Sequence, residues 1–256
     1  MHKLITQIIE YIQRFFNASY QKEPKSQPKI LKVSSQKGKS TGYEPYRLEK
    51  YNLQSHELMY GTPGQGLTSS GFSSDAINLG QQGEVNFAKA LQKRGLLDRL
   101  LTFWSVHNLG LYQEKIDADV DCIVVSATTI WLIDLKFYAS GDVTYRVIDD
   151  KLYTIDNQTE AYVGQPKKMS HNMANAHKRF QEKFGVLTKY FQLKSCVVLM
   201  PTNKGEGILD SVSWPGNIPA MNLREMLAVL EKEDQFVDTI GAQKVKQTFQ
   251  VLTKRK

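Results

Sequence analysis

Cysteine is scarce in this sequence, and its thiols are not spaced as metal ligands. The chain has two cysteines, Cys122 and Cys196, each inside an apolar run. No Cys-x-x-Cys pair occurs, so the pattern does not indicate a thiolate zinc site. We favour buried thiols over a redox or metal role, and this usage predicts a reducing, cytoplasmic compartment.

Long uninterrupted apolar runs are also missing. No segment approaches the roughly 18 apolar residues that indicate a membrane-spanning helix. Residues 1–17 show apolar side chains at helical spacing, but Gln7 and Glu10 interrupt them, which disfavours a cleavable signal peptide. We expect an amphipathic helix that packs on the domain, binds a protein partner or, through residues 3–16, lies on a membrane surface. The first two are favoured, because its polar side has few Lys and Arg residues.

An excess of acid is absent as well. The formal net charge is +7 and the pI about 9.2, which favours an anionic partner such as nucleic acid or an acidic membrane surface. Residues 18–75 are rich in Lys, Ser, Gln, Gly and Pro and show little periodicity. Such a composition buries little surface, so the sequence predicts a largely irregular, flexible linker there.

Strong periodicity begins after this linker. Ser74 can cap a helix whose apolar stripe runs through Leu79, Gly83, Phe87 and Leu91 and which ends near Gly95. Strand-like runs, a hairpin, a basic helix over about 165–183 and a further strand follow. The order predicts an α/β fold, a single domain over 76–205 with a mixed β-sheet flanked by helices. Residues 206–256 are expected to form a helical extension packed on it.

Charged residues stand at the edges of the two most strand-like segments, "DCIVV" and "IWLIDLK". Asp134 and Lys136 share one face of their strand, because side chains alternate. If residues 126–129 form the turn of a hairpin, Asp121 lies opposite Asp134. The pattern therefore predicts two neighbouring carboxylates beside a lysine.

Two close carboxylates repel each other, and a divalent cation relieves that repulsion. Mg²⁺ prefers oxygen ligands and can polarise a phosphoryl oxygen. Glu84 lies at helical spacing with Phe87 and Leu91, on the face expected to meet the sheet, so it needs a polar partner such as this site or Lys136. Each residue alone is better explained as a solvated end or cap, but four converging at one sheet edge favour a functional site.

This arrangement resembles a known family. Gly83-Glu84 on a helix, followed by "DVDCIVV" and "WLIDLK", looks like the nuclease-related domain (NERD) of the PD-(D/E)xK nuclease superfamily, over about residues 78–200. The resemblance implies a restriction-endonuclease-like core and divalent-metal-dependent cleavage of DNA, with Mg²⁺ or Mn²⁺. It implies Asp121, Asp134 and Glu84 as metal ligands and Lys136 as the catalytic lysine. Met169 stands where many members carry Gln, and Gln165 is a possible accessory residue.

Basic residues follow the predicted site. Lys167, Lys168, Lys178 and Arg179 would contact phosphates, or they form only a solvated helix face. Two functions are therefore predicted from different classes. One is a metal-dependent nuclease that hydrolyses phosphodiester bonds, with DNA as the expected substrate. The alternative is a non-cleaving module that keeps the nuclease fold and binds nucleic acid or protein.

Overall fold

The computed structural model describes residues 53–54, 56–65, 74–106, 119–138, 142–185, 187–201 and 205–237, with 242, 245, 246 and 249. All of them belong to one compact unit, Leu48–Lys256. The amphipathic helix predicted for residues 1–17 and most of the linker predicted for 18–75 lie outside the described residues.

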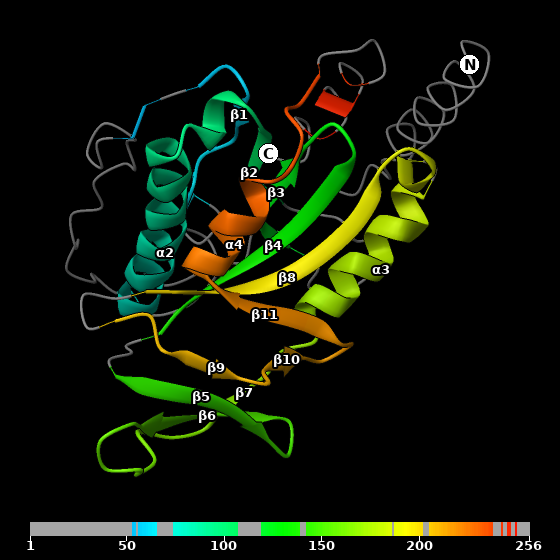
Figure 1. Cartoon of the computed structure of the whole chain (residues 1–256). Helices are drawn as coiled ribbons and strands as arrows, with labels where there is room; N and C mark the ends of the chain where they lie inside the picture. Colours follow the sequence, from blue (N-terminus) through cyan, green and yellow to red (C-terminus); the bar gives the residue numbers. More distant parts are fainter. Residues whose placement is uncertain are drawn as a thin grey trace, which may run out of the picture. The chain divides into compact units, whose positions relative to one another are not determined.

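A seven-stranded mixed sheet forms the centre of this unit (Figure 1). Its order is β1-β2-β3-β4-β8-β11-β10. Strand β3 is antiparallel to both of its neighbours, β2 and β4, whereas β8 runs parallel to both β4 and β11, and β1 runs parallel to β2. The mixed α/β class predicted from the sequence is confirmed. The bounds are β1 Met59–Tyr60, β2 Leu101–Val106, β3 Val120–Val125, β4 Thr129–Phe137, β8 Gln192–Met200, β10 Ser213–Trp214 and β11 Ile218–Asn222.

Helices cover both faces of this sheet because its central strands are apolar on both sides. In β4, Ile130 and Leu132 pack in one core with helix α3, and Trp131 and Ile133 pack in another with α2 and α4. Figure 1 accordingly shows α2 and α4 on one side and α3 on the other. The helices are α2 Ser74–Lys93, α3 Asn172–Phe184 and α4 Leu223–Leu230, and short 3₁₀ turns span Leu96–Asp98 and Leu187–Lys189.

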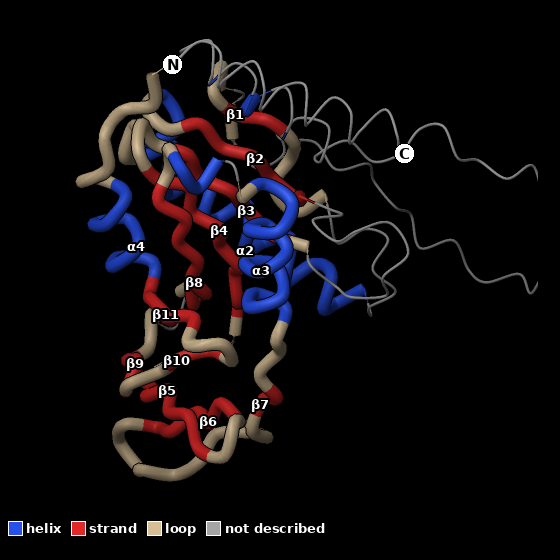
Figure 2. Tube along the Cα trace, turned by 90° about the vertical axis from the view of Figure 1, so that its right-hand side faces the viewer, coloured by secondary structure: helices blue, strands red, loops and turns tan. Residues whose placement is uncertain are grey.

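A four-stranded sheet of order β7-β6-β5-β9 adjoins one end of the larger one, and it lies below it in Figures 1 and 2. Val143, Tyr145 and Leu152 on its inner face belong to the same core as α3. The predicted hairpin over this region is confirmed, since β5 and β6 pair through the turn at Asp149 and Asp150. The strands are β5 Val143–Ile148, β6 Lys151–Asp156, β7 Lys167–Lys168 and β9 Ile208–Asp210.

Three segments differ from the sequence-based expectations. Part of the expected linker is ordered sheet, because β1 pairs with β2 and Leu53 and Met59 are buried. The expected helical extension after residue 206 contains α4, but it first supplies β9, β10 and β11. Finally, Leu79 does not belong to the buried stripe of α2, as its side chain is exposed. The first two differences involve short strands whose place is decided by pairing with a distant strand.

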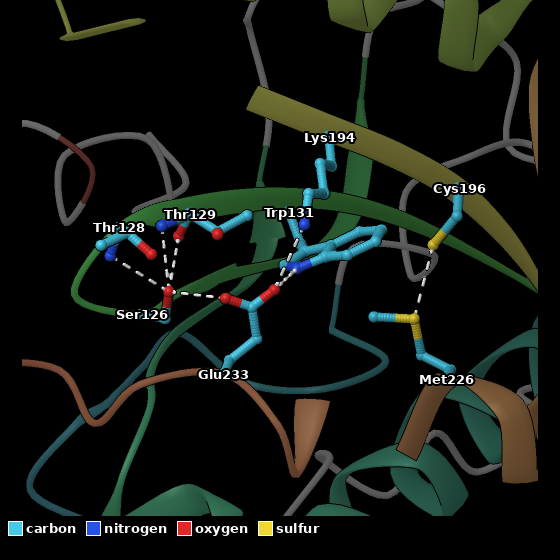
Figure 3. Close-up of polar contacts among 8 residues, drawn as sticks. All are labelled: Ser126, Thr128, Thr129, Trp131, Lys194, Cys196, Met226 and Glu233. Carbon is cyan, nitrogen blue, oxygen red and sulfur yellow. Dashed lines mark hydrogen bonds and ion pairs between the residues drawn. The ribbon is translucent and has the colours of Figure 1, made fainter. Parts of the chain in front are cut away.

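A half-buried carboxylate attaches the segment after α4 to the far end of the sheet (Figure 3). Glu233 accepts hydrogen bonds from Trp131 Nε1 at 2.9 Å and from Ser126 Oγ at 3.0 Å. Lys194 Nζ lies 3.5 Å from the same carboxylate and over the Trp131 ring. Burial would raise the pKa of Glu233, but these hydrogen bonds and Lys194 outweigh it and lower that pKa. The C-terminal segment is therefore part of the fold.

Both cysteines are fully buried in the core, as predicted, and Cys196 Sγ lies 3.6 Å from Met226 Sδ (Figure 3). Trp104 and Trp131 are buried as well. In the part of the chain that the structure describes, no helix has the length and apolar character needed to cross a membrane.

Candidate active site

The β3–β4 pair has the register predicted from the sequence. Cys122 lies opposite Ile133, and Ile123 lies opposite Leu132. One step further along the same register places Asp121 across from Asp134. The two carboxylates therefore start from adjacent strands at the end of the hairpin remote from its turn.

Asp134 and Lys136 form the central ion pair of the candidate site. Lys136 Nζ lies 2.8 Å from Asp134 Oδ1 and 2.7 Å from Oδ2, and Asp134 is only 3% exposed. Burial alone would lower the pKa of Lys136, but Asp134 and then Asp121 outweigh it and raise that pKa. The ammonium is thus held charged against the end of β4.

Asp121 adds a second carboxylate to this pair. Its Oδ2 accepts a hydrogen bond from the backbone N–H of Leu135 at 2.7 Å. Burial, followed by the charge of Asp134, raises the pKa of Asp121 to about 7, although Lys136 and the Leu135 N–H act in the opposite direction. At neutral pH the site therefore carries an acid that is poised between its two protonation states.

Glu84 supplies the third carboxylate from helix α2. Gly83 allows α2 to approach β4, since a Cβ at that position would lie 3.0 Å from Phe137 Cβ. Glu84 is 2% exposed, and burial raises its pKa well above the ordinary value, with further increases from Asp121 and Asp134. This mutual effect links the buried Glu84 and Asp134 with the half-buried Asp121, and Lys136 pairs with Asp134 beside them. The catalytic and metal-binding roles expected of these four residues remain predictions.

A turn that the sequence analysis assigned to the linker holds Glu84 in place. The backbone N–H of Gly64 donates to Glu84 Oε2 at 2.7 Å, and Ser105 Oγ donates to the same oxygen at 3.4 Å. The carbonyl oxygen of Thr62 lies closer to Ser105 Oγ, at 3.0 Å, so the single hydroxyl proton is shared between these two acceptors. The Thr62-Pro63-Gly64-Gln65 turn, with Gly64 at φ +80°, is what Pro-Gly at the centre of a type II turn favours. That dipeptide was the available sequence signal.

Replacing Gly64 with alanine should destabilise the protein by more than backbone strain alone. A Cβ at Gly64 would lie 3.0 Å from Gln81 Cα and 3.1 Å from Gln81 Cβ, so the turn would be pushed away from Glu84. Gly95 has a similar φ of +66° and open space around it, which makes Gly95→Ala the matched control. We expect Gly95→Ala to cost about 1–2 kcal/mol in unfolding free energy and Gly64→Ala at least about 1 kcal/mol more, measured by urea denaturation. Equal losses would contradict this packing.

The basic residues predicted to lie on one helix are in fact divided. Helix α3 begins only at Asn172, whereas Lys167 and Lys168 form β7 and pair with β6. The pairing with β6 holds the two lysines in an extended segment, and Lys167 Nζ lies 4.7 Å over the ring of Tyr138. The predicted helix over 165–183 is therefore wrong in its first part.

The remaining predicted residues have separate surroundings. Lys178 is exposed, but Arg179 is largely covered and donates to Glu182 at 2.9 Å. Gln165 is exposed ahead of β7, and Met169 is buried in the core with α3. The position at which the resemblance implied a glutamine therefore serves packing in this chain.

Residues 79–200 match the family model described as nuclease-related domain, NERD. This segment is a NERD domain. It runs from α2 to the end of β8 and contains all four residues of the charged cluster. No curated protein and no solved structure matches the chain.

The structure extends the NERD segment on both sides. Strand β1 and the turn at Gly64 precede it, and β9, β10, β11 and α4 follow it. These additions complete the same sheets, and the turn at Gly64 contacts Glu84 directly. The folded unit around the site is therefore larger than the matched segment.

The donor set of the NERD domain fits a hard divalent cation in its chemistry. It offers buried and half-buried carboxylates whose mutual repulsion a cation would relieve. The arrangement of these side chains does not yet form a metal site: among the described residues no group of three or more His, Cys, Asp and Glu side chains is placed to hold a metal ion. Lys136 engages both oxygens of Asp134, while Asp121 and Glu84 each accept a backbone N–H through one oxygen.

Proposed function

We propose that this NERD domain is a metal-dependent nuclease that hydrolyses phosphodiester bonds in DNA. The single observation that supports the proposal is the charged cluster of Glu84, Asp121, Asp134 and Lys136, in which Glu84 and Asp134 are almost fully buried. Burying Glu84 and Asp134 close to a third acid is energetically costly, and groups with such perturbed pKa values are concentrated at functional sites. The matched family, described as nuclease-related, supports the same reaction class.

Asp121, Asp134 and Glu84 would hold Mg²⁺ or Mn²⁺. When bound, the cation would supply Lewis-acid stabilisation of charge on the phosphoryl group. Lys136 keeps its proton, because the neighbouring acids raise its pKa, and so places a fixed positive charge beside the acids. That charge can orient an attacking water or stabilise the charge that develops on the phosphate. The Gly64 N–H fixes the direction of Glu84.

Basic residues near the site would bind the substrate backbone. Lys168 and Lys178 are exposed, and Lys167 lies over Tyr138 beside the end of β4. Arg179 is turned towards Glu182, so it contributes less to such contacts. Phosphate contacts of this kind fix the position of DNA and weaken with salt.

Metal-dependent cleavage by the full-length protein is the deciding experiment. Purified protein is incubated with supercoiled and linear DNA in Mg²⁺, in Mn²⁺ or in chelator, beside Asp134→Ala. We expect cleavage in either metal, none in chelator and none by the variant. DNA retention without any cleavage would overturn the nuclease.

DNA retention without cleavage would favour a binding module that keeps the nuclease fold. The observations in its favour are Met169 in the core and the engagement of both Asp134 oxygens by Lys136. The proposed role of residues 3–16 in contacting a protein or membrane surface is independent of either outcome.

A further inference from the structure

The outer face of the four-stranded sheet exposes apolar and aromatic side chains. Side chains alternate along β5: Val143 and Tyr145 point into the core, so Thr144 and Arg146 point outward. The register of β6 then places Tyr153 and Ile155 on the same outer face. Tyr162, which bridges to Ile155, and Ile208 of β9 lie on this face as well. Tyr162 is 62% exposed and Ile208 58% exposed.

Two tyrosines on this face form a pair. The ring centroids of Tyr153 and Tyr162 lie 5.2 Å apart with an angle of 57° between the ring planes. Exposed aromatic rings supported by a strand are the platforms on which unpaired bases stack, and such stacking tolerates any base sequence. A fully paired duplex does not present its base faces in this way.

Two lysines lie beside the tyrosines. Lys151 and Lys168 are directly opposite each other on β6 and β7, both exposed, and neither forms an ion pair within the described residues. Like charges directly opposite each other destabilise a sheet, and an anion between them would relieve that repulsion. Arg146 is already paired with Asp210 at 2.7 Å. Asp149 and Asp150 lie in the turn at the edge of the face, so phosphates are expected on the Lys168 side.

Strand β7 links this face to the candidate active site. Lys167, next to Lys168, points to the opposite side and lies over the ring of Tyr138. Tyr138 follows β4 two residues after Lys136. A nucleic-acid strand bound on the outer face could therefore extend across β7 towards the charged cluster.

We propose that the outer face of the four-stranded sheet binds a single-stranded segment of nucleic acid, with bases stacked on Tyr153 and Tyr162 and phosphates on Lys151 and Lys168. This rests on the proposed function, because it takes nucleic acid as the partner. It goes further by naming a single strand as the bound form and a surface outside the catalytic cluster as its binding site.

Fluorescence anisotropy with the full-length protein in chelator tests this assignment. The probes are a labelled oligothymidylate and a labelled DNA duplex of the same length. Tyr162→Ala should weaken binding of the single strand by about 10-fold, because stacking contributes about 1–3 kcal/mol per base, and it should leave duplex binding nearly unchanged. Tyr190→Ala is the matched control, since Tyr190 is also exposed but follows the 3₁₀ turn before β8.

Lys168→Gln tests the charge part of the proposal. It should reduce the slope of log affinity against log salt by about 1, whereas Lys93→Gln, at the exposed end of α2, should not. Thermal melting checks that each variant is folded. Unchanged affinity for the single strand in both Tyr162→Ala and Lys168→Gln would overturn the proposal, and a protein would then be the expected partner of this face.

The two proposals fail separately. If the wild type cleaves DNA but the Tyr162→Ala and Lys168→Gln variants bind the single strand normally, the proposed binding surface is wrong and the proposed nuclease function is retained. If the wild type binds the single strand through this face but never cleaves, the nuclease is wrong and the surface stands.

Discussion

Replacing Lys136 with methionine should lower DNA cleavage by at least about 10²-fold to 10³-fold. That is the usual effect of removing one preorganised group that stabilises charge in the transition state. The methionine keeps the unbranched stem of the side chain but lacks the terminal ammonium, which lies within 2.8 Å of both Asp134 oxygens. Cleavage rates of plasmid DNA in saturating Mg²⁺ measure this loss.

A loss of activity in this variant has to be separated from a loss of folding. Without its partner, the buried Asp134 carboxylate should destabilise the fold by about 3–5 kcal/mol. The Lys136→Met/Asp134→Asn double variant removes both charges and should recover much of that stability, because a neutral pair avoids an unpaired buried charge. It should remain as inactive as either single variant. Activity that returns with stability would contradict a chemical role for Lys136.

Lys194→Met is the matched control for these variants. Lys194 also pairs with a carboxylate, that of Glu233, but at the opposite end of β4 and β8. Its loss should change stability modestly and leave the cleavage rate of the folded protein unaltered. Equal loss of activity in both lysine variants would indicate that any disturbance of the sheet stops the reaction.

The site was predictable from the sequence where local rules govern its geometry. The alternation of side chains placed Asp134 and Lys136 on one face, and the short turn fixed Asp121 across from Asp134. Helical spacing correctly put Glu84 on the buried side of α2 with Phe87 and Leu91. Each of these inferences needs only a few neighbouring residues.

The parts that were missed depend on distant pairing. Strand β1 is two residues long and gains its place only from β2, about forty residues later in the chain. The same holds for β9, which pairs with β5. In β7, two adjacent lysines have no strand-like pattern of their own, and the pairing with β6 outweighs the helical appearance of the basic run. Composition identified residues 53–65 as linker because composition carries no information about such partners.

Deprotonation of Asp121 should make the metal-free protein less stable as the pH rises. The pKa of this carboxyl is about 7 in the folded chain, compared with an ordinary value of 3.8, so the folded state holds the proton more tightly than the unfolded state. The stabilisation that comes from this bound proton is complete below the ordinary pKa of 3.8 and is lost as the pH rises towards 7. This interval corresponds to about 4 kcal/mol at 1.36 kcal/mol for each pH unit. The raised pKa of Glu84 adds an effect of the same sign.

Asp121→Asn should therefore stabilise the protein at about pH 8 in chelator and flatten its pH dependence, while abolishing cleavage. The asparagine can still accept the hydrogen bond from the Leu135 N–H, so the backbone contact is kept. Urea denaturation at about pH 5 and about pH 8 measures the effect, and Asp150→Asn, in the exposed β5–β6 turn, is the control. Excess Mg²⁺ should stabilise the wild type at about pH 8 more than it stabilises Asp121→Asn, since binding to the folded state adds to its stability. If the wild type were equally stable at both pH values in chelator, Asp121 would not share a buried site with Asp134, and the acids would lack the repulsion that a cation is proposed to relieve.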